Sequence, residues 1–201
     1  MNSTAAENRA SFEERITPWF APSDRDLIIS VYNFSKDGHR PQRRKDGSRY
    51  FEHPRHVALL VMDRFGCMQP AVICAALLHD VLEDVDGCSP ERLERMFGKE
   101  ICQIVVRVTK NPKQGYYDRL IRFGEWPELL VKLCDQLHNL HNLGTGTTPE
   151  WRRKQCLETR DRYYPVFDRL ARITPADYHA EIVRAIEEIK VLVEAGLAQT
   201  G

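Results

Sequence analysis

The stretch 75-AALLHDVLEDVDG-87 joins the most hydrophobic part of the chain to a cluster of ionisable groups. Four apolar residues lead directly into His79 and Asp80, and Glu83 and Asp84 follow one helical turn later. Acidic side chains near the C-terminus of a helix oppose its dipole, at a cost of about 0.3–1 kcal/mol each. An acidic cluster in this position therefore indicates a functional site rather than an ordinary helix end.

The length and charge of the chain limit the classes of function. Its 201 residues are typical of one domain, and 42% of them are hydrophobic, which is enough for a substantial core. Lys plus Arg and Asp plus Glu both number 29, so the formal net charge is zero. General nucleic-acid or membrane-surface binders normally carry a basic excess, so we expect neither partner. A local basic cluster for a small anionic ligand remains compatible with this balance.

The cysteines and the N-terminus indicate a cellular compartment. Six cysteines are scattered without a CxxC pair, and several lie in apolar runs, where free cysteine behaves as a small hydrophobe. The first residues lack the apolar core of a secretory signal, and no apolar run reaches the ~18 residues of a membrane helix. The sequence therefore predicts a reduced, cytoplasmic protein.

Helical periodicity runs through nearly the whole chain. The predicted helices cover residues 22–38, 53–66, 69–87, 89–98, 99–110, 126–144, 148–170 and 174–196, with Ser23, Ser89, Thr148 and Thr174 as candidate N-caps. Only 42-QRRKDGSRYF-51 breaks the pattern, and its central Asp-Gly indicates a small hairpin or tight loop. The predicted fold is an all-α, multi-helix bundle with one small basic hairpin or loop.

Four residues with metal-ligand chemistry stand at the ends or in the apolar faces of these helices. His79 and Asp80 point about 100° apart on a helix but can still converge on one ion beside its end. His53 lies at a predicted helix start, and Asp135 is a lone carboxylate among apolar residues. Two imidazoles and two carboxylates suit manganese, iron or zinc better than calcium.

Each of these residues also has a purely structural alternative. His53 can serve as a helix cap or hydrogen-bond partner, and Asp135 can pair with Lys132 three residues earlier. Glu83 and Asp84 can simply be the solvated end of a helix.

Four segments together resemble a known family. They are HP at 53–54, ALLHDVLED at 76–84, TK at 109–110 and VKLCDQLHNL at 131–140. The pattern resembles the HD-domain phosphohydrolases, specifically the alarmone hydrolase domain of the RelA/SpoT proteins, whose stand-alone versions are the small alarmone hydrolases. We accordingly expect an N-terminal segment (1–22), an HD-type hydrolase domain (23–173) and a C-terminal helix (174–201) packed on the same domain.

The resemblance implies a reaction and roles for the acidic cluster. Such enzymes hydrolyse the 3′-pyrophosphate of guanosine tetra- or pentaphosphate, the alarmones of the stringent response, and release pyrophosphate with GDP or GTP. It implies a single manganese ion held by His53, His79, Asp80 and Asp135. Glu83 and Asp84 would position and deprotonate the attacking water, as a carboxylate near a metal is able to do.

The resemblance also implies the nucleotide contacts. The expected substrate-binding residues are Arg44, Lys45, Asp46, Tyr50, Asn139, Asn142 and Tyr163. Arg44 and Lys45 would pack around the base and ribose, since a guanidinium stacks on a purine and a lysine offers a point charge to phosphate. Core packing is the alternative role for both tyrosines, and His138 is expected to be structural or exposed.

Departures from the family pattern leave the identity of the base open. Asp46 stands where a small serine is usual, and it either accepts hydrogen bonds from the base or belongs to the Asp-Gly turn. Cys134, Gln136 and Asn142 also depart from the usual residues. The alternative substrates are an adenosine alarmone, another nucleoside phosphate or the 2′-phosphate of NADPH.

Two non-enzymatic functions are also compatible with parts of the sequence. A catalytically silent alarmone sensor has no need of the Glu83–Asp84 pair, and a structural metal bundle has no need of the Arg44–Lys45 loop.

Overall fold

A computed structural model describes residues 8–144 and 146–199, and the regular secondary structure of this part of the chain is helical apart from one short hairpin. The elements are α1 (Arg9–Ile16), α2 (Pro22–Gly38), α3 (Glu52–Leu59), the π-helical η1 (Leu60–Arg64), α4 (Pro70–Leu78), α5 (Val81–Asp84), α6 (Pro90–Phe97), α7 (Lys99–Val108), α8 (Tyr116–Phe123), α9 (Trp126–His141), α10 (Pro149–Glu158), the π-helical η2 (Thr159–Tyr163), α11 (Tyr164–Ile173) and α12 (Ala176–Ala198). The all-α bundle with a small basic hairpin is confirmed.

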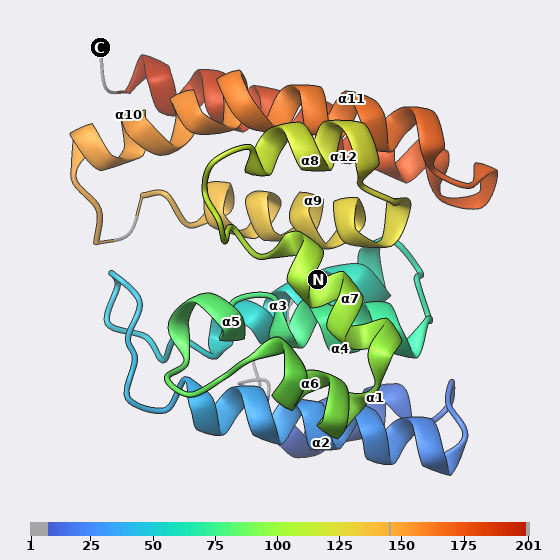
Figure 1. The fold of residues 1–201 in the computed structure, drawn as a ribbon. Coiled ribbons are helices and arrows are strands. Elements are labelled where there is room, and N and C mark those ends of the chain that lie inside the picture. The colour runs from blue at the N-terminus through green and yellow to red at the C-terminus, as the bar shows by residue number, and fades with distance from the viewer. Residues whose placement is uncertain (1–7, 145, 200–201) are drawn as a thin grey trace.

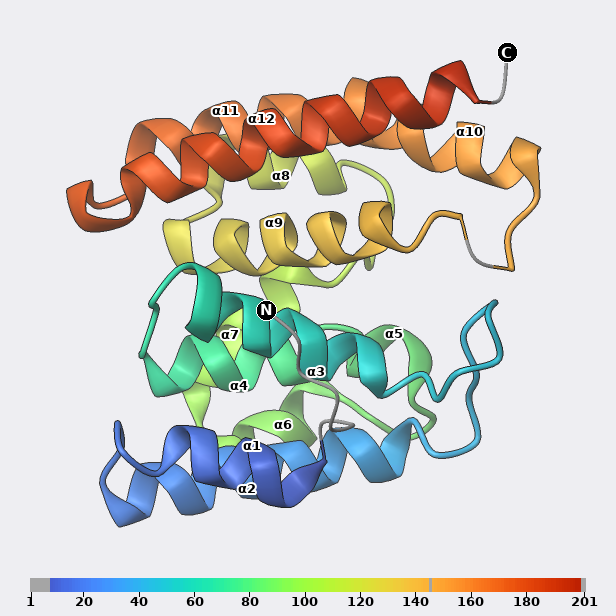
Figure 2. The same cartoon turned by 180° about the vertical axis from the view of Figure 1, so that it is seen from behind.

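The helices form stacked layers (Figures 1 and 2). Helices α1, α2 and α6 lie at one side, α3, α4 and α7 form the middle, and α8, α10, α11 and α12 cover the other side. Helix α9 lies between the last two groups and contacts α3, α4 and α7 as well as α11 and α12. Side chains at the α3–α4–α9 junction are therefore enclosed from several directions.

The two central helices owe their position to their apolar composition. Every residue of α4 from Val72 to Leu78 is buried, and so is every residue of α9 from Glu128 to Leu137. A helix that is apolar on all sides, as α4 is, is stable only inside a protein, whereas the buried part of α9 also carries Glu128, Lys132, Asp135 and Gln136. Each buried large aliphatic side chain contributes about 1.5–3 kcal/mol relative to the exposed state.

The predicted helix 69–87 is wrong in one respect that matters for the site: it breaks at His79–Asp80. Helix α4 ends at Leu78, and the short α5 starts again at Val81. The Ser35 hydroxyl donates to the Leu77 carbonyl at 2.6 Å, and the His79 ring lies 2.8 Å from the Ala76 carbonyl. These contacts satisfy carbonyls that the next helical turn would otherwise use. Glu83 and Asp84 therefore lie in a separate turn.

The predicted basic loop is a short hairpin closed by one antiparallel bridge between Arg43 and Arg49. Its turn has hydrogen bonds between Arg44 and Ser48 and from the Gly47 N–H to the Arg44 carbonyl, both 2.9 Å. Gly47 has a φ of +83°, which glycine adopts without strain. Figures 1 and 2 show this hairpin reaching toward the connection between α9 and α10.

Several predicted helix ends and extents differ from the structure. Thr148 and Ser89 cap α10 and α6 as predicted. Ser23 does not cap α2, which begins at Pro22, and Thr174 donates its hydroxyl to the Leu170 carbonyl instead of capping α12. The predicted helix 148–170 contains a π-helical turn, a feature often found at functional sites.

The sequence does not predict α1 and α8. Each is only eight residues long and has two buried residues, Phe12 with Ile16 in α1 and Tyr116 with Leu120 in α8. Helix α1 packs on α2, while α12 packs on α9, α10 and α11. The domain boundaries at 22/23 and 173/174 stay a prediction.

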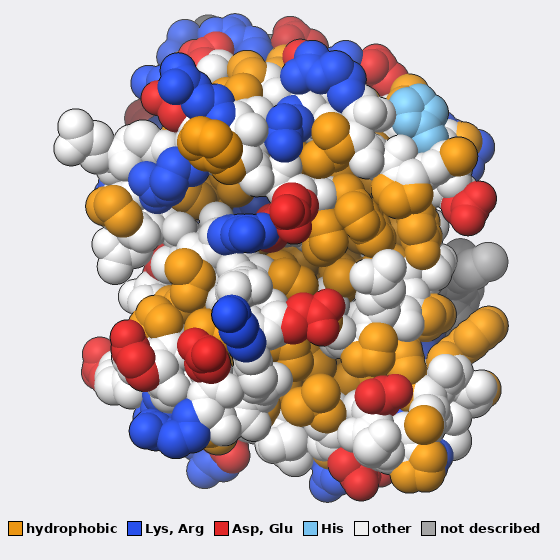
Figure 3. Space-filling model, turned by 45° about the vertical axis from the view of Figure 1, so that its right-hand side comes forward, with side chains coloured by type: hydrophobic (Ala, Val, Ile, Leu, Met, Phe, Trp, Pro, Cys, Tyr) orange, Lys and Arg blue, Asp and Glu red, His pale blue; other side chains and the backbone are white. Residues whose placement is uncertain are grey.

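The surface carries charges of both signs. Figure 3 shows basic and acidic side chains intermixed around a central area of hydrophobic side chains on one face. Among the described residues, no helix is both long and apolar enough to cross a membrane. All six cysteines are free, and Cys88 is the one that is not buried.

A glycine in the α9–α10 connection allows this connection to lie against the backbone of the hairpin. Gly146 has a φ of +67°, and a Cβ placed there would lie 2.4 Å from the Lys45 carbonyl oxygen. Gly47 is also left-handed, but a Cβ there would meet nothing within 4 Å.

We expect Gly47→Ala to lower the free energy of unfolding by about 1–2 kcal/mol, the cost of placing a Cβ in a left-handed conformation. Gly146→Ala adds a backbone clash, so its loss should be clearly larger in chemical denaturation. Equal losses for the two variants would contradict the close contact.

Candidate active site

The four predicted metal ligands lie together at the junction of α3, α4 and α9. The His53 Nε2 atom is 3.2 Å from His79 Nε2 and 3.1 Å from an Asp135 Oδ1 atom. An Asp80 Oδ2 atom lies 3.2 Å from His79 Nε2 and 3.7 Å from His53 Nε2. The break after Leu78 lets the adjacent His79 and Asp80 face the same point.

Burial and charge shift the pKa values of this cluster. Burial lowers the pKa of His53. Burial also disfavours the charged form of His79, but the neighbouring Asp80 outweighs it and raises the pKa to about 9. The pKa of Asp80 and that of Asp135 are lowered despite burial, by His79 and by Lys132 respectively. Without a metal ion, the site therefore holds its carboxylates ionised beside a protonated imidazole.

Hydrogen bonds outside the cluster orient the two imidazoles. The His79 Nδ1 atom lies 2.8 Å from the Ala76 carbonyl, so Nδ1 carries the proton in the neutral ring and Nε2 faces the cluster. The His53 Nδ1 atom lies 2.8 Å from His138 Nδ1, and the His138 ring stacks on His56. A hydrogen bond on the far nitrogen is the usual support of a ligand histidine.

His138 therefore has a more specific place than the sequence predicts. Its spacing, three residues after Asp135 on α9, is the signal that places it beside the same site.

Asp135 has both of the roles between which the sequence left a choice: it pairs with Lys132 and it faces the cluster of His53, His79 and Asp80. One of its carboxylate oxygens accepts a hydrogen bond from Lys132 Nζ at 2.7 Å. The other accepts from Asn139 Nδ2 at 2.7 Å and faces His53. The ion pair with Lys132 compensates the buried charge, and it leaves the second oxygen directed at the cluster.

Glu83 and Asp84 are exposed beside the cluster. Glu83 lines the same cavity as His53 and Asp135, about 260 Å³ in volume, and accepts a hydrogen bond from the Lys110 N–H at 2.7 Å. The Tyr50 hydroxyl lies 2.8 Å from Asp84 and 2.9 Å from Asp80. Because a phenol has one proton, it donates to one of these carboxylates at a time. Tyr50 is therefore part of the site rather than the core.

The hairpin and α9 enclose a second cavity of about 340 Å³ next to the cluster. Its lining includes Arg44, Lys45, Asp46, Tyr50, Asn139 and Asn142 of the predicted nucleotide-binding set. The Arg44 guanidinium donates to the Asn139 side-chain oxygen at 3.0 Å. The sequence missed Trp151, whose ring lies 3.5 Å from Lys45 Nζ and lines this cavity. Trp151 lies two residues after Pro149, at the start of α10. The Thr-Pro pair predicts the helix start, but only the fold brings Trp151 next to the hairpin.

Asp46 holds the hairpin turn. One of its carboxylate oxygens accepts hydrogen bonds from the Ser48 N–H at 2.9 Å and the Ser48 hydroxyl at 2.6 Å. These bonds lower the pKa of Asp46. The geometry is that of an Asx turn and agrees with the turn alternative.

Tyr163 is buried and lines the catalytic cavity, so it belongs to both the core and the cavity wall. Asn142 is exposed and donates to the His138 carbonyl at 2.7 Å. Gln136, next to Asp135, accepts from the buried Thr159 hydroxyl at 3.1 Å.

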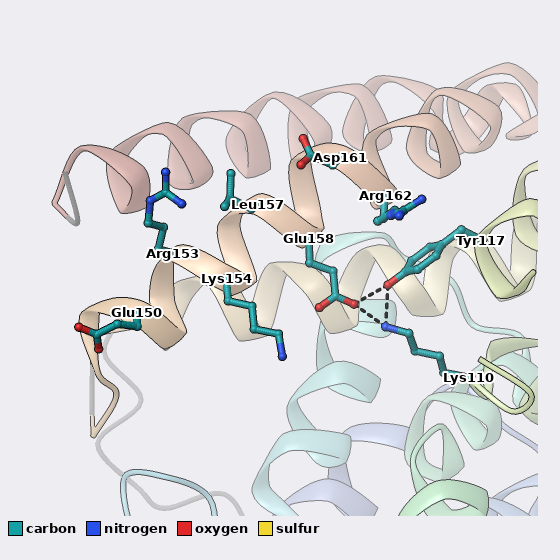
Figure 4. A pocket seen from close by; sticks show the side chains of 9 residues that line it. All are labelled: Lys110, Tyr117, Glu150, Arg153, Lys154, Leu157, Glu158, Asp161 and Arg162. Atoms are coloured by element: carbon teal, nitrogen blue, oxygen red, sulfur yellow. Dashed lines mark hydrogen bonds and ion pairs between the residues drawn. The ribbon is translucent and has the colours of Figure 1, made fainter. Parts of the chain in front are cut away.

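A third cavity, about 620 Å³, adjoins the catalytic cavity at Lys110 and Glu158 (Figure 4). Figure 4 shows Lys110, Tyr117 and Glu158 pointing toward one another, and Lys110 Nζ lies 2.7 Å from the Tyr117 hydroxyl. Its other cationic lining residues are Arg153, Lys154 and Arg162. The catalytic cavity therefore lies between the hairpin cavity and a cation-bearing one.

The donor set at the cluster fits a small divalent cation. Two imidazole Nε2 atoms face each other at 3.2 Å, an arrangement in which at most one of them carries a proton. Ligand atoms of His53, His79 and Asp80 all lie within 4.8 Å of one another. Mixed nitrogen and oxygen ligands around one point are typical of catalytic transition-metal sites. A helical bundle with this His…His-Asp…Asp set defines an HD-type metal-dependent phosphohydrolase.

Comparisons with known proteins agree with this class. Residues 32–117 match the family model of the HD domain. A probable guanosine-3′,5′-bis(diphosphate) 3′-pyrophosphohydrolase of Synechocystis is 36% identical over 156 residues, which are 72% of this chain but 20% of that protein. The guanosine-3′,5′-bis(diphosphate) 3′-pyrophosphohydrolase MESH1 of Xenopus tropicalis is 35% identical over 144 residues, 68% of this chain and 80% of that protein.

A solved structure is also similar. It is described as a metazoan ortholog of SpoT that hydrolyses ppGpp, and it matches with a TM-score of 0.65 and 30% identity over 81% of this chain and 94% of its own. This chain spans about a fifth of the long bacterial relatives and most of the short animal one. The chain belongs to the family of HD-domain guanosine-3′,5′-bis(diphosphate) 3′-pyrophosphohydrolases.

The raised pKa of His79 predicts how metal binding depends on pH. Because the folded-state pKa is about 9, the ring is protonated at pH 7 and must lose its proton to become a ligand. Metal affinity should therefore rise with pH, about tenfold per unit, and level off above about 9. Titration calorimetry in buffers of different ionisation enthalpy should detect about one proton released per ion at pH 7. An affinity that is constant between pH 7 and 9 would contradict the assignment.

Proposed function

We propose that this chain is a manganese-dependent hydrolase in the cytoplasm that cleaves the 3′-pyrophosphate of guanosine 3′,5′-bis(diphosphate)-type alarmones. The products are pyrophosphate and GDP or GTP. The observation that carries the proposal is the alignment of three parts: a hairpin cavity suited to a nucleoside, a metal-ligand cluster with two exposed carboxylates, and a cation-bearing cavity beyond them. A nucleotide with phosphates on both sides of its ribose matches this order of a nucleoside cavity, a metal-ligand cluster and a cation-bearing cavity.

At the cluster, some residues are the proposed metal ligands and others hold those ligands in position. His53, His79, Asp80 and Asp135 would hold one divalent cation, which supplies Lewis acidity toward phosphate oxygens and water. Lys132 and Asn139 keep Asp135 ionised and oriented. Through its two Nδ1 contacts, the chain holds both imidazoles with Nε2 inward.

Glu83 and Asp84 are the candidates for moving the proton of the attacking water. Glu83 lines the catalytic cavity, and its carboxylate is fixed by the Lys110 N–H. Asp84 is held by Tyr50, which also touches Asp80. Because Glu83 and Asp84 are adjacent residues of one helical turn, the Glu83 carboxylate can accept a proton while Asp84 stays paired with the Tyr50 phenol.

The hairpin supplies the nucleoside contacts. The Arg44 guanidinium is fixed by Asn139 and presents a planar cation to the hairpin cavity. The Trp151 indole lies on the same cavity and is covered by Lys45. A planar guanidinium and an indole are the surfaces on which purines stack, at about 1–3 kcal/mol per base.

The third cavity is the proposed binding site for the substrate phosphates that do not lie at the metal-ligand cluster. Four cations line it (Lys110, Arg153, Lys154 and Arg162) against three carboxylates (Glu150, Glu158 and Asp161), and Lys110 forms an ion pair with Glu158 at its border with the catalytic cavity. Cations in a chain of zero net charge give a local attraction for a polyphosphate.

The direct test is incubation of the manganese-loaded protein with guanosine and adenosine alarmones, other nucleotides and NADPH, followed by anion-exchange chromatography of the products. Pyrophosphate and GDP from guanosine 3′,5′-bis(diphosphate) are expected. Release of phosphate from NADPH alone, or no product from any nucleotide, would refute the proposal.

Glu83→Gln should separate proton transfer from metal binding. The amide keeps the shape of the side chain but cannot accept a proton, so turnover should fall about 10²–10⁴-fold with the metal retained. Asp135→Ala is the matched comparison and should lose the metal itself, as elemental analysis after reconstitution would show. Near wild-type turnover when both Glu83 and Asp84 are neutralised would remove these acids from the mechanism.

Asp46→Asn tests whether the hairpin turn reads the base. The amide oxygen retains both bonds to Ser48, so we expect the ratio of turnover on guanosine and adenosine alarmones to stay unchanged. A change of about 5- to 150-fold, which corresponds to the roughly 1–3 kcal/mol of discrimination from one good base contact, would show that Asp46 contacts the base.

A further inference from the structure

A fourth cavity lies on the outer side of the hairpin, away from the metal-ligand cluster. It has a volume of about 340 Å³ and is enclosed by α2, the hairpin, the start of α1 and α3. Six of its ten lining residues are basic and none is acidic: the basic ones are Arg9, Lys36, Arg40, Arg43, Arg49 and Arg55. The whole chain has equal numbers of basic and acidic residues, so this concentration is local.

The innermost of these residues is Arg55, whose guanidinium is buried in the α3 wall. Arg55 is 4% exposed, and its Nε–H has no hydrogen-bond partner among the described residues. Its terminal nitrogen pairs with Glu52, but that carboxylate is shared with Arg49 at 3.0 Å. Two guanidinium groups thus depend on one carboxylate. A buried N–H without a partner is normally satisfied by a water molecule, an ion or a ligand.

The surrounding cations are only partly neutralised. Arg40 pairs with Asp37 at 2.8 Å and Arg9 with Glu13 at 3.4 Å, both at the exposed margin. Lys36 is half-buried and has no ion-pair partner among the described residues. The remaining walls are the buried aromatic rings of Tyr32 and Phe51, which pack edge to face. The cavity therefore offers several cationic donors at its polar side and no acceptor carboxylate.

We propose that this cavity is a second ligand site, which binds a diphosphate group on the outer face of the hairpin. A planar guanidinium recognises phosphate by paired hydrogen bonds, and several such groups around one cavity suit an anion with more than one charge. Inorganic pyrophosphate and the diphosphate end of a nucleotide share this chemistry. The site is independent of the proposed hydrolytic reaction.

The position of the site connects it with the nucleotide cavity. Arg43 and Arg49 are the bridged pair of the hairpin and line the outer cavity, and Arg43 also lines the hairpin cavity together with the neighbouring Arg44 and Tyr50. His39 is another wall residue, and its ring stacks on Tyr50 at 4.8 Å. A ligand that holds Arg43 and Arg49 together therefore restrains the segment that presents Arg44 to the substrate.

The test uses manganese-loaded full-length protein and inorganic pyrophosphate in titration calorimetry. Wild type should bind two pyrophosphate ions per chain, one at the metal and one at the outer cavity. Lys36→Ala/Arg49→Ala should raise the Kd of the second component at least about tenfold, because two charge-assisted contacts are lost. Arg95→Ala/Lys99→Ala removes the same charge from exposed positions of α6 and α7 and should bind like wild type.

Hydrogen exchange of the hairpin amides supplies the second readout. Pyrophosphate should slow exchange at residues 43–49 more in wild type and in the Arg95→Ala/Lys99→Ala control than in Lys36→Ala/Arg49→Ala. GDP in place of pyrophosphate distinguishes the sources: equal occupancy of the outer site shows that the diphosphate group itself is recognised.

Three results would overturn the proposal. They are the absence from wild type of a pyrophosphate component that persists in Asp135→Ala, an unchanged outer-cavity component in Lys36→Ala/Arg49→Ala, and binding of a single-stranded oligonucleotide to the outer cavity without binding of pyrophosphate. None of these depends on whether the chain hydrolyses an alarmone, so failure here and failure of the proposed function are distinguishable.

Discussion

Two carboxylates packed against two imidazoles form the constraint on which the rest of this structure depends. Asp80 and Asp135 lie within 3.2 Å of an imidazole nitrogen; Asp135 is buried, and the Asp80 side chain is 16% exposed. Removing ionised groups from water costs more than a single contact returns, so each carboxylate needs several partners. Lys132, Asn139 and Tyr50 supply them from α9 and the hairpin. The site and the packing of these elements therefore stabilise one another.

The hairpin shows how this constraint extends outward. Tyr50 ties it to Asp80 and Asp84, Arg44 ties it to Asn139, and Gly146 allows the α9–α10 connection to contact the Lys45 backbone. A two-strand ribbon of this length has little stability by itself. Its conformation is defined by polar contacts to the cluster on the inner face, while its outer face carries arginines of the fourth cavity.

The segment that matches the HD-domain model supplies only part of the site. That match covers residues 32–117, which include the hairpin, His53 and the His79–Asp80 break. Asp135, the fourth member of the cluster, comes from α9, where the neighbouring Gln136 bonds to Thr159, and Tyr163 at the end of η2 lines the catalytic cavity. Both the cluster and the surrounding cavity therefore need segments on either side of residue 117.

The sequence alone determined the all-helical fold, the hairpin and the four residues of the cluster. Apolar periodicity specifies a buried helix because burial follows composition, and isolated His and Asp residues in apolar helices are chemically conspicuous. The tertiary structure decided what periodicity does not encode: the break after Leu78, the contact of His138 with His53, and the approach of Trp151 to Lys45. These depend on long-range contacts such as the Ser35 hydroxyl on the Leu77 carbonyl. A pattern read along one helix contains no information about partners 42 or more residues away.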